Sequence, residues 1–322
     1  MRVPLTVGDF LDRAALVFPD RVAVVDEPAA SGGPASLGRV TYGSLARRAR
    51  NMASVLGSSL GVGAGDRVAI VSPNSARFLT AFFGVSGWGR VLVPINFRLT
   101  AEEVSYIVDH SGATVLLVDP EQADALAGVD AKVKIVLDGS ADDVELFAES
   151  DASPEPWSGD EDATASINYT SGTTARPKGV QLTHRNLWVN STTFGWHTTV
   201  SDRDTYLHTL PMFHCNGWGM PYATVGLGVK NVVLRKVDGA EILRRVDRYG
   251  VTLLCGAPAV VNTVLDAAQE WSGEIPGRGR TRIVVAGAPP PTRTIERVET
   301  ELGWEFIQIY GLTETSPLLT IN

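Results

Sequence analysis

The chain has 322 residues, of which 44% are hydrophobic and 20% are charged, so it can bury one large core or two smaller ones and is neither disordered nor fibrous. The formal net charge of −8 argues against nucleic acid or an anionic membrane as the main partner, but anionic small molecules stay open. The two cysteines, Cys215 and Cys255, are far apart in sequence and predict neither a disulfide framework nor a cysteine-rich metal site.

The first twenty residues, MRVPLTVGDFLDRAALVFPD, carry three aspartates among their apolar positions. They lack the basic head and apolar block of a signal peptide. No apolar run approaches the length that spans a membrane. We therefore expect a cytoplasmic protein in a reducing compartment, without membrane insertion.

The first half of the chain alternates segments of helical spacing with short runs of β-branched residues. Helices are predicted over 44–56 and 76–88, and strands over 66–71, 90–96, 113–119 and 133–138. This order is typical of parallel βα units. Loops or linkers are predicted where glycine, proline or acidic residues gather, at 27–39, 150–162 and 271–280.

The alternation resumes after the second linker. Strands are predicted over 165–170, 205–211, 229–236, 251–256, 282–287 and 304–311, and helices from about Thr183 and over 239–250. The sequence therefore predicts an α/β fold of two stacked, mainly parallel β-sheet subdomains flanked by helices. We place the first subdomain at residues 1–160 and the second at 161–322.

The segment NYTSGTTARPKGVQLTH, residues 168–184, concentrates hydroxyl side chains around glycine. Such a loop is as often a plain turn as a binding site. Its hydroxyls and the backbone N–H groups near Gly172 could nevertheless enclose phosphoryl oxygens, and Lys178 would add a mobile positive charge. The hydroxyl side chains concerned are Thr170, Ser171, Thr173 and Thr174.

A nucleoside-triphosphate loop of the G-x-x-x-x-G-K-[ST] type is one alternative, because Gly172 and Lys178 have the required separation. Pro177 and Gly179 occupy the positions of its second glycine and its magnesium-binding hydroxyl. The VQL that follows has the character of a strand and not of a helix. We expect a loop between two strands, with a helix beginning at Thr183.

The combination of TSGTT with PKG resembles the phosphate-loop motif YTSGTTGxPKG of the adenylate-forming (AMP-binding) superfamily, and within it the acyl-CoA and aryl-CoA synthetases, which are ligases. Ala175 replaces one glycine of that motif. Five further segments resemble the family's motifs in the same order: 40–56, 89–119, LPMFHCNGWG at 210–219, VAGAPPP at 285–291 and QIYGLTETSP at 308–317.

The resemblance implies that a fatty or aryl acid reacts with ATP to give an acyl-adenylate and pyrophosphate, and that the acyl group then passes to CoA or a carrier-protein thiol. Residues 170–174 and Lys178 would hold the β- and γ-phosphates. The ring of Tyr310 would stack on the adenine, and Pro289 stands where many relatives carry a small residue. The residues that would surround the base are Gly287, Ala288, Pro289, Tyr310 and Gly311.

The same resemblance implies the reacting centre. Thr313 would contact the α-phosphate, and Glu314 would hold Mg²⁺, a cation that usually takes only one or two protein carboxylates. His214 would stand as a gate beside the substrate carboxylate. The acyl pocket would begin at Asn216, Gly217 and Trp218, and the catalytic assignments are Thr313, Glu314, His214 and Lys178.

His214 and Cys215 are neighbours, which suggests two other interpretations: a metal pair, or a thiol nucleophile with its base. Adjacent residues of a strand point to opposite faces, so we give both interpretations low weight.

The sequence stops in PLLTIN, before the ribose-binding aspartate, the hinge and the C-terminal lid domain with its lysine that relatives carry. We therefore expect the large N-terminal portion of a synthetase, weakly active or inactive by itself. The alternative is a non-catalytic module that binds a nucleotide or an acyl ligand.

Overall fold

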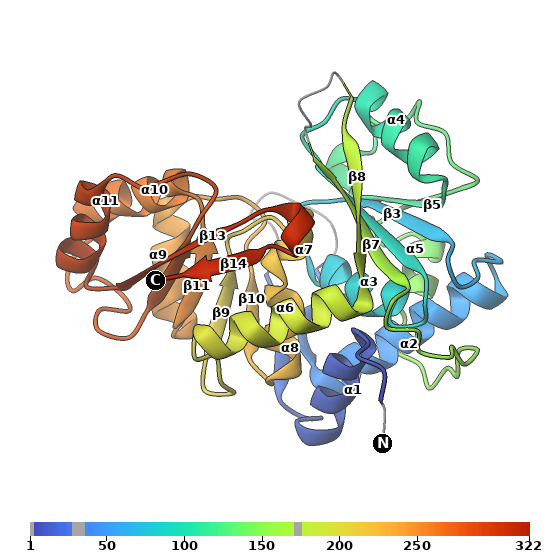
Figure 1. Cartoon of the computed structure of the whole chain (residues 1–322), viewed down its shortest axis with the longest axis horizontal. Coiled ribbons are helices and arrows are strands. Elements are labelled where there is room, and N and C mark those ends of the chain that lie inside the picture. Colours follow the sequence, from blue (N-terminus) through green and yellow to red (C-terminus); the bar gives the residue numbers. More distant parts are fainter. Residues whose placement is uncertain (1–2, 28–35, 171–175) are drawn as a thin grey trace.

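The computed structural model describes residues 3–27, 36–170 and 176–322. Two β-sheets, with helices packed between them and on their outer faces, form this part of the chain (Figure 1). No helix in the described ranges is long and apolar enough to cross a bilayer.

Within those ranges the smaller sheet has six strands, in the order β6-β5-β3-β4-β7-β8. Neighbouring strands run parallel except β7 and β8, which form an antiparallel hairpin at one edge. In Figure 1 the hairpin rises beside helix α4 (Ala101–Ser111). The strand bounds are Val133–Val136 (β6), Ala113–Val118 (β5), Arg67–Val71 (β3), Val91–Ile95 (β4), Thr164–Thr170 (β7) and Lys178–Thr183 (β8).

The larger sheet contains eight strands of the described chain, in the order β14-β13-β12-β11-β9-β10-β1-β2. The inner strands are parallel, whereas β14 and β2 at the two edges are antiparallel to their neighbours. The bounds are Leu318–Ile321 (β14), Glu305–Gly311 (β13), Arg282–Val285 (β12), Leu253–Gly256 (β11), Thr205–His208 (β9), Lys230–Val233 (β10), Val22–Asp26 (β1) and Gly38–Thr41 (β2).

The helices connect these strands and cover the sheets. The remaining α-helices are Gly8–Val17 (α1), Tyr42–Ser58 (α2), Ala76–Ser86 (α3), Ala141–Leu146 (α5), His184–His197 (α6), Cys215–Trp218 (α7), Met220–Gly226 (α8), Gly239–Tyr249 (α9), Pro258–Gln269 (α10) and Thr292–Arg297 (α11). Short turns of other helical types are Pro120–Gln122 (η1), Val298–Leu302 (η2) and Thr313–Thr315 (η3).

The main hydrophobic core lies between the two sheets, where α3 contacts both β1 and β4. Tyr222 of α8 is fully buried there and meets the rings of Phe82 and Phe83 edge to face, with centroids 5.4 Å and 5.7 Å away. Two further cores lie on the outer faces, under α9 and α10 on the larger sheet and under α4 on the smaller one. Strands with a core on each face explain the nearly continuous apolar runs in the sequence.

Helix α6 begins where the phosphate-loop segment ends. The Oγ1 of Thr183 accepts a hydrogen bond from the Asn186 N–H at 3.1 Å, and Asn186 Oδ1 accepts one from the Thr183 N–H at 3.2 Å. This reciprocal cap satisfies two N–H groups at the helix start. The predicted helix start at Thr183 is confirmed.

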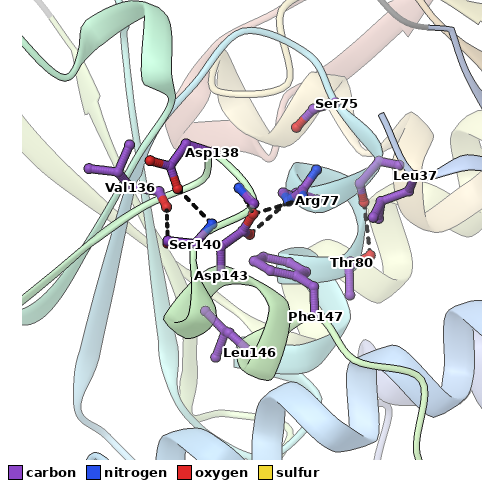
Figure 2. A network of polar contacts seen from close by, with 12 residues as sticks. Leu37, Ser75, Arg77, Thr80, Val136, Asp138, Ser140, Asp143, Leu146 and Phe147 are labelled. Carbon is purple, nitrogen blue, oxygen red and sulfur yellow. Dashed lines mark hydrogen bonds and ion pairs between the residues drawn. The ribbon is translucent and has the colours of Figure 1, made fainter. Parts of the chain in front are cut away.

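A buried ion pair joins α3 to α5 (Figure 2). The Nε and Nη2 of Arg77 donate to the two carboxylate oxygens of Asp143, each at 2.8 Å. Asp143 also accepts a hydrogen bond from the Gly139 N–H at 2.8 Å, and the guanidinium lies 5.7 Å from the ring centre of Phe147. The two parallel hydrogen bonds fix the geometry of the pair. Removal of one partner would lower the free energy of unfolding substantially.

The α/β prediction, with two mainly parallel sheets flanked by helices, is confirmed. The division into residues 1–160 and 161–322 does not follow the sheets. Strands β1 and β2 belong to the larger sheet with β9–β14, and β7 and β8 belong to the smaller one. The physical reason is strand pairing: β1 is parallel to β10, so an early segment completes a late sheet.

Candidate functional site

Three of the segments that the sequence singles out lie at the carboxyl ends of parallel strands in the larger sheet: 210–219, 285–291 and 308–317. Strand β9 runs toward the turn after His214, β12 leads to Gly287, and β13 carries Tyr310. Val285 of β12 pairs with Gln308 of β13. Gly287 and Tyr310 each follow two residues later on these parallel neighbours, so they lie at the same edge of the sheet. Ligands of open α/β sheets bind at this edge.

The loop after β12 is open to solvent. Gly287, Ala288 and Pro289 are exposed, and the φ angle of Gly287 is +92°, a left-handed value that favours glycine. The Tyr310 side chain is 57% exposed. An exposed aromatic ring beside an open loop provides an apolar surface that a planar base could cover.

The chain reverses between β13 and β14 through η3. Gly311 approaches Pro317 so closely that an added Cβ would lie 1.8 Å from the Pro317 carbonyl oxygen, which leaves room only for glycine. Thr315 Oγ1 accepts a hydrogen bond from the Leu312 N–H at 3.0 Å and closes the turn. The peptide bond before Pro317 is cis.

Thr313 and Glu314 lie on this turn. Glu314 is exposed, and its carboxylate has no hydrogen bond or ion pair with the residues that the structure describes. A hard cation that keeps most of its water shell needs only one such carboxylate. No cluster of three or more His, Cys, Asp or Glu side chains suited to a metal ion is present in the described ranges. Glu314 therefore fits Mg²⁺ held jointly with phosphates, and not a cage made by the protein alone.

Five consecutive residues after His214 adopt a left-handed backbone, so the segment labelled α7 is a left-handed turn and not a regular α-helix. The φ angles are +43°, +52°, +58°, +58° and +79° for Cys215, Asn216, Gly217, Trp218 and Gly219. A left-handed conformation costs roughly 1–2 kcal/mol for each residue that carries a Cβ. Contacts from other parts of the chain must therefore hold this turn, which we call the left-handed turn (215–219).

Two asparagine side chains, from the loop before α3 and from α6, provide some of those contacts. Asn74 accepts a hydrogen bond from the Met212 N–H at 2.7 Å, just before the turn. Asn190 of α6 donates to the Trp218 carbonyl at 3.3 Å and accepts from the Leu318 N–H at 3.0 Å. The Asn190 amide thus connects the left-handed turn to β14.

The left-handed turn also touches η3. The Sγ of Cys215 lies 3.9 Å from the Thr313 carbonyl oxygen, and strand β8 also contacts η3. Asn216 is fully buried, and its side chain bonds to Ser166 and Asn168 of β7. Trp218 is also buried. The structure thus brings the predicted acyl-pocket segment, the nucleotide turn and the phosphate hairpin together.

The hairpin pairs Thr170 with Lys178, so two predicted phosphate contacts lie opposite each other, and Lys178 is exposed. Helix α4 supports the hairpin: the Tyr106 hydroxyl donates to the Pro177 carbonyl at 3.3 Å, and a ring nitrogen of His110 lies 2.8 Å from the Tyr169 hydroxyl. The predicted contacts Ser171, Gly172, Thr173 and Thr174, with Ala175, lie outside the described residues.

Lys178 is the first residue of β8, and the strand continues to Thr183. A nucleoside-triphosphate loop of the alternative type would need a helix to open at this lysine. The structure contradicts that alternative and confirms the two strands predicted on either side of the loop segment, β7 and β8.

Electrostatics distinguish the neighbours His214 and Cys215. Burial raises the pKa of Cys215 to about 12, and the nearby Glu314 carboxylate adds to the shift, while the hydrogen bond to Thr313 opposes it. Desolvation by the surrounding protein lowers the pKa of His214, even though the side chain is still open to solvent. A neutral thiol beside a neutral imidazole does not form a nucleophile with its base.

The prediction that His214 and Cys215 are adjacent residues of a strand is wrong. Cys215 begins the left-handed turn and His214 precedes it, so neither belongs to a strand. Glycine and asparagine, which tolerate left-handed geometry best, make up part of this segment and could have signalled a turn.

Comparisons with known proteins agree with this geometry. A family model described as AMP-binding enzyme matches residues 11–322. The chain is 36% identical to a long-chain-fatty-acid–CoA ligase of Thermus thermophilus, in an alignment that covers 99% of this chain and 59% of the relative. It is 35% identical to 4-hydroxybutyrate–CoA ligase 2 of Metallosphaera sedula, over 95% of this chain and 57% of the relative.

The crystal structure of the N-terminal domain of FACL13 from Mycobacterium tuberculosis has a TM-score of 0.84 and 28% sequence identity to this chain. The match covers 100% of this chain and 79% of that structure. The chain spans 57–59% of the length of the two curated relatives named above.

Proposed function

Because this chain belongs to the family of AMP-binding enzymes, we propose that it provides the ATP and carboxylate sites of an acid:CoA ligase. A carboxylate oxygen attacks the α-phosphorus of ATP, the bond to the β-phosphate breaks, and acyl-adenylate and pyrophosphate form. The sulfur of CoA then attacks the acyl carbonyl carbon. AMP leaves, the thiol proton is released, and a thioester is formed.

The observation that supports this proposal most is the contact between Cys215 and Thr313, with a sulfur–oxygen distance of 3.9 Å. It joins the segment assigned to the acid with the segment assigned to the nucleotide. Adenylation requires the carboxylate and the α-phosphate to be adjacent, since effective catalysis depends on reactants held within contact distance.

The residues near this contact suit the chemistry. Two anions must approach each other, so the barrier is mainly electrostatic. Mg²⁺, when bound, neutralises phosphate charge, and the Glu314 carboxylate would hold it. Lys178 would hold the outer phosphates, Thr313 would donate to the α-phosphate, and Tyr310 would stack on the adenine.

His214 would orient the substrate carboxylate as a neutral hydrogen-bond donor, because desolvation lowers its pKa. Asn216 has a different role from direct substrate contact. Its side-chain amide is committed to β7, so it would shape the acid site through the backbone of the left-handed turn. Trp218 would supply apolar surface at the pocket.

We propose an aliphatic acid as the substrate. The two curated relatives are named for a long-chain fatty acid and for 4-hydroxybutyrate, both aliphatic. The indole ring of Trp218 is compatible with an apolar acyl chain. Preferred use of an aryl acid in a panel of aliphatic and aryl acids would contradict this proposal.

A separate cavity of about 860 Å³ would accept the anionic end of CoA. It lies beyond the ends of β4 and β10, where Phe97, Arg98 and Lys236 line it. Its other arginines are engaged, as Arg235 is with Asp119, whereas Arg98 and Lys236 have no ion pair with the described residues. The Arg98 guanidinium lies 4.5 Å from the ring centre of Phe97, and cations without a carboxylate partner suit a ligand that carries phosphates.

Calorimetric titration of the chain with a non-hydrolysable ATP analogue and Mg²⁺ tests the nucleotide site. We expect Lys178→Ala and Glu314→Gln to weaken binding at least tenfold, by removing a charge-assisted contact worth about 1.4 kcal/mol or more. The exposed residues Lys132 and Glu299 supply matched controls, Lys132→Ala and Glu299→Gln. Absence of nucleotide binding would contradict the proposal.

Acid-dependent exchange of labelled pyrophosphate into ATP separates a ligase from a binding module. Exchange supports adenylation. Because we expect this chain to be weakly active or inactive by itself, nucleotide binding without exchange favours the non-catalytic module only where the chain joined to the C-terminal lid domain of a relative also lacks exchange for every acid of a broad panel. For CoA, we expect Arg98→Ala with Lys236→Ala to weaken CoA binding and to leave ATP-analogue binding unchanged.

A further inference from the structure

A closed ring of three hydrogen bonds joins β7 to the left-handed turn. The Ser166 hydroxyl donates to Asn168 Oδ1 at 3.1 Å, and Asn168 Nδ2 donates to Asn216 Oδ1 at 3.2 Å. Asn216 Nδ2 then donates back to Ser166 Oγ at 2.7 Å. Each group in the ring is once a donor and once an acceptor.

The ring is sealed from solvent. Ser166 and Asn216 are 0% exposed and Asn168 is 2% exposed. In such surroundings hydrogen bonds reinforce one another, and a partner left unpaired costs more than it does in water. Asn168 Nδ2 makes a further bond to the Phe213 carbonyl at 3.3 Å, the residue before His214. Asn168 therefore donates hydrogen bonds to the acid segment on both sides of His214, to Phe213 and to Asn216.

The ring lies on the strand that leads into the phosphate loop. Residues 166, 168 and 170 alternate along β7, so Thr170 shares a face of the sheet with the two ring members Ser166 and Asn168. Thr170 pairs with Lys178 on the opposite strand. Any ligand that fixes these two residues also fixes the strand segment that carries the ring.

The left-handed turn needs such support. Cys215, Asn216 and Trp218 all have positive φ angles, and this strain persists only where surrounding contacts over-determine the backbone. Asn216 is the central member of the three, and its side chain bonds to β7. A shift of β7 would therefore strain the hydrogen bonds that hold the turn and the Phe213 carbonyl before His214.

We propose that Asn168 is a positioning residue that couples nucleotide binding at the hairpin to the order of the acid-binding turn, through Asn216. The inference rests on the proposed function, in which phosphates bind at Thr170 and Lys178. Nucleotide binding would stiffen β7, hold the ring closed and pre-organise the turn for the carboxylate. Each ligand would then favour the binding of the other.

Hydrogen exchange of the chain with and without an ATP analogue and Mg²⁺ tests this coupling and needs no knowledge of the acid. The amides of Gly217 and Gly219 donate within the left-handed turn, to His214 and Asn216, and report on it. We expect the analogue to slow exchange both in β7–β8 and at these amides, the latter about fivefold or more, the low end of coupling between sites.

Asn168→Ala is expected to retain slower exchange in β7–β8 and to lose it at Gly217 and Gly219. Asn51→Ala is the matched control: Asn51 is also buried, and it donates to the Glu145 and Leu146 carbonyls far from the site. The control is expected to lose stability yet to keep the full nucleotide effect on the turn.

If Asn168→Ala does not fold, Ser166→Ala tests the inference in its place, because it removes one hydroxyl and opens the ring. We expect this variant to lose at least half of the nucleotide effect on exchange in the turn. An unchanged effect in the Asn168 or Ser166 variant overturns the inference, as does a wild-type chain that protects β7–β8 but not the turn. A chain with no nucleotide effect anywhere contradicts the proposed function itself, and the inference with it.

Discussion

The Sγ of Cys215 lies 3.9 Å from the carbonyl oxygen of Thr313, two residues that are 98 positions apart in the sequence. The contact seals the left-handed turn against η3. It also places the thiol beside Glu314, whose charge contributes to the raised pKa of Cys215. The cysteine thus belongs to the wall between two segments of the site and not to the reacting groups.

The two cysteines should be unreactive in the folded chain. Burial raises the pKa of both Cys215 and Cys255 to about 12, so the thiolate fraction at pH 8 is on the order of 10⁻⁴. We expect a disulfide reagent at pH 8 to modify neither thiol before unfolding and both in denaturant. The Cys215→Ser variant shows whether any labelling of the native chain occurs at Cys215 or at Cys255. Fast labelling of Cys215 in the native chain would refute its burial.

The tight approach of Gly311 to Pro317 predicts a large difference between two glycine variants. Gly311→Ala drives a methyl group into a backbone carbonyl and should separate β13 from β14, with a loss of several kcal/mol in the free energy of unfolding. Gly287→Ala meets no atom closer than 3.9 Å and should cost about 1 kcal/mol, from its positive φ alone. Urea unfolding of both variants measures the difference; equal losses would show that the close approach is absent.

Two buried histidines predict a loss of stability in acid. Burial lowers the pKa of His208 and of His184 to about 4 from 6.5, so the unfolded chain binds more protons between these values. The stabilisation is present above pH 6.5 and is lost as pH falls toward 4. From pH 7 to pH 5 each histidine should remove about 2 kcal/mol from the free energy of unfolding.

Urea unfolding at both pH values tests this histidine effect. His208→Gln should have the smaller drop, by about 2 kcal/mol. Replacement of the exposed His197 by glutamine serves as the control. An unaltered pH dependence in His208→Gln would mean that His208 is not held neutral.

The ion pair between Arg77 and Asp143 predicts a non-additive mutant cycle. Asp143→Ala removes the two hydrogen bonds that this carboxylate accepts from the buried Arg77 guanidinium and should cost about 3–5 kcal/mol. Arg77→Met combined with Asp143→Leu should recover most of that loss, since apolar side chains of similar volume can replace a buried pair. Thermal or urea unfolding of the single and double variants measures the cycle. A double variant no more stable than Asp143→Ala would contradict this account.

Local pattern was enough to predict most inner strands of the two sheets. Strand β3, for example, follows from the apolar run within 66–71, because a strand covered on both faces must be apolar along most of its length. Strand β1 escaped prediction because its parallel partner β10 is distant in sequence. Strand β14 was missed for another reason: it is only four residues long, although its partner β13 directly precedes it. Strand β1 adjoins a segment predicted as a loop, and its neighbour β10 contributes the stabilising ladder.

The residues of the candidate site also fall into those that the sequence could predict and those that it could not. Motif residues such as Tyr310 and Glu314 could be singled out by resemblance, and the structure places them on adjoining segments. Asn74, Asn168 and Asn190 escaped notice, because a buried amide that binds distant backbone leaves no periodic signal in sequence. The left-handed turn was missed for a related reason: cysteine and tryptophan rarely adopt positive φ, and only tertiary contacts impose it.

The parallel pairing of β1 with β10 has a consequence for synthesis on the ribosome. Asn231 of β10 donates a hydrogen bond to Ala23 of β1, across 208 positions of chain. The smaller sheet draws all of its strands from 67–183 and can assemble as soon as that stretch has emerged. Strand β1 must wait, unpaired on its open side, until β10 is translated, because long-range pairing closes last. The beginning of the chain is therefore among the last parts to reach its native place.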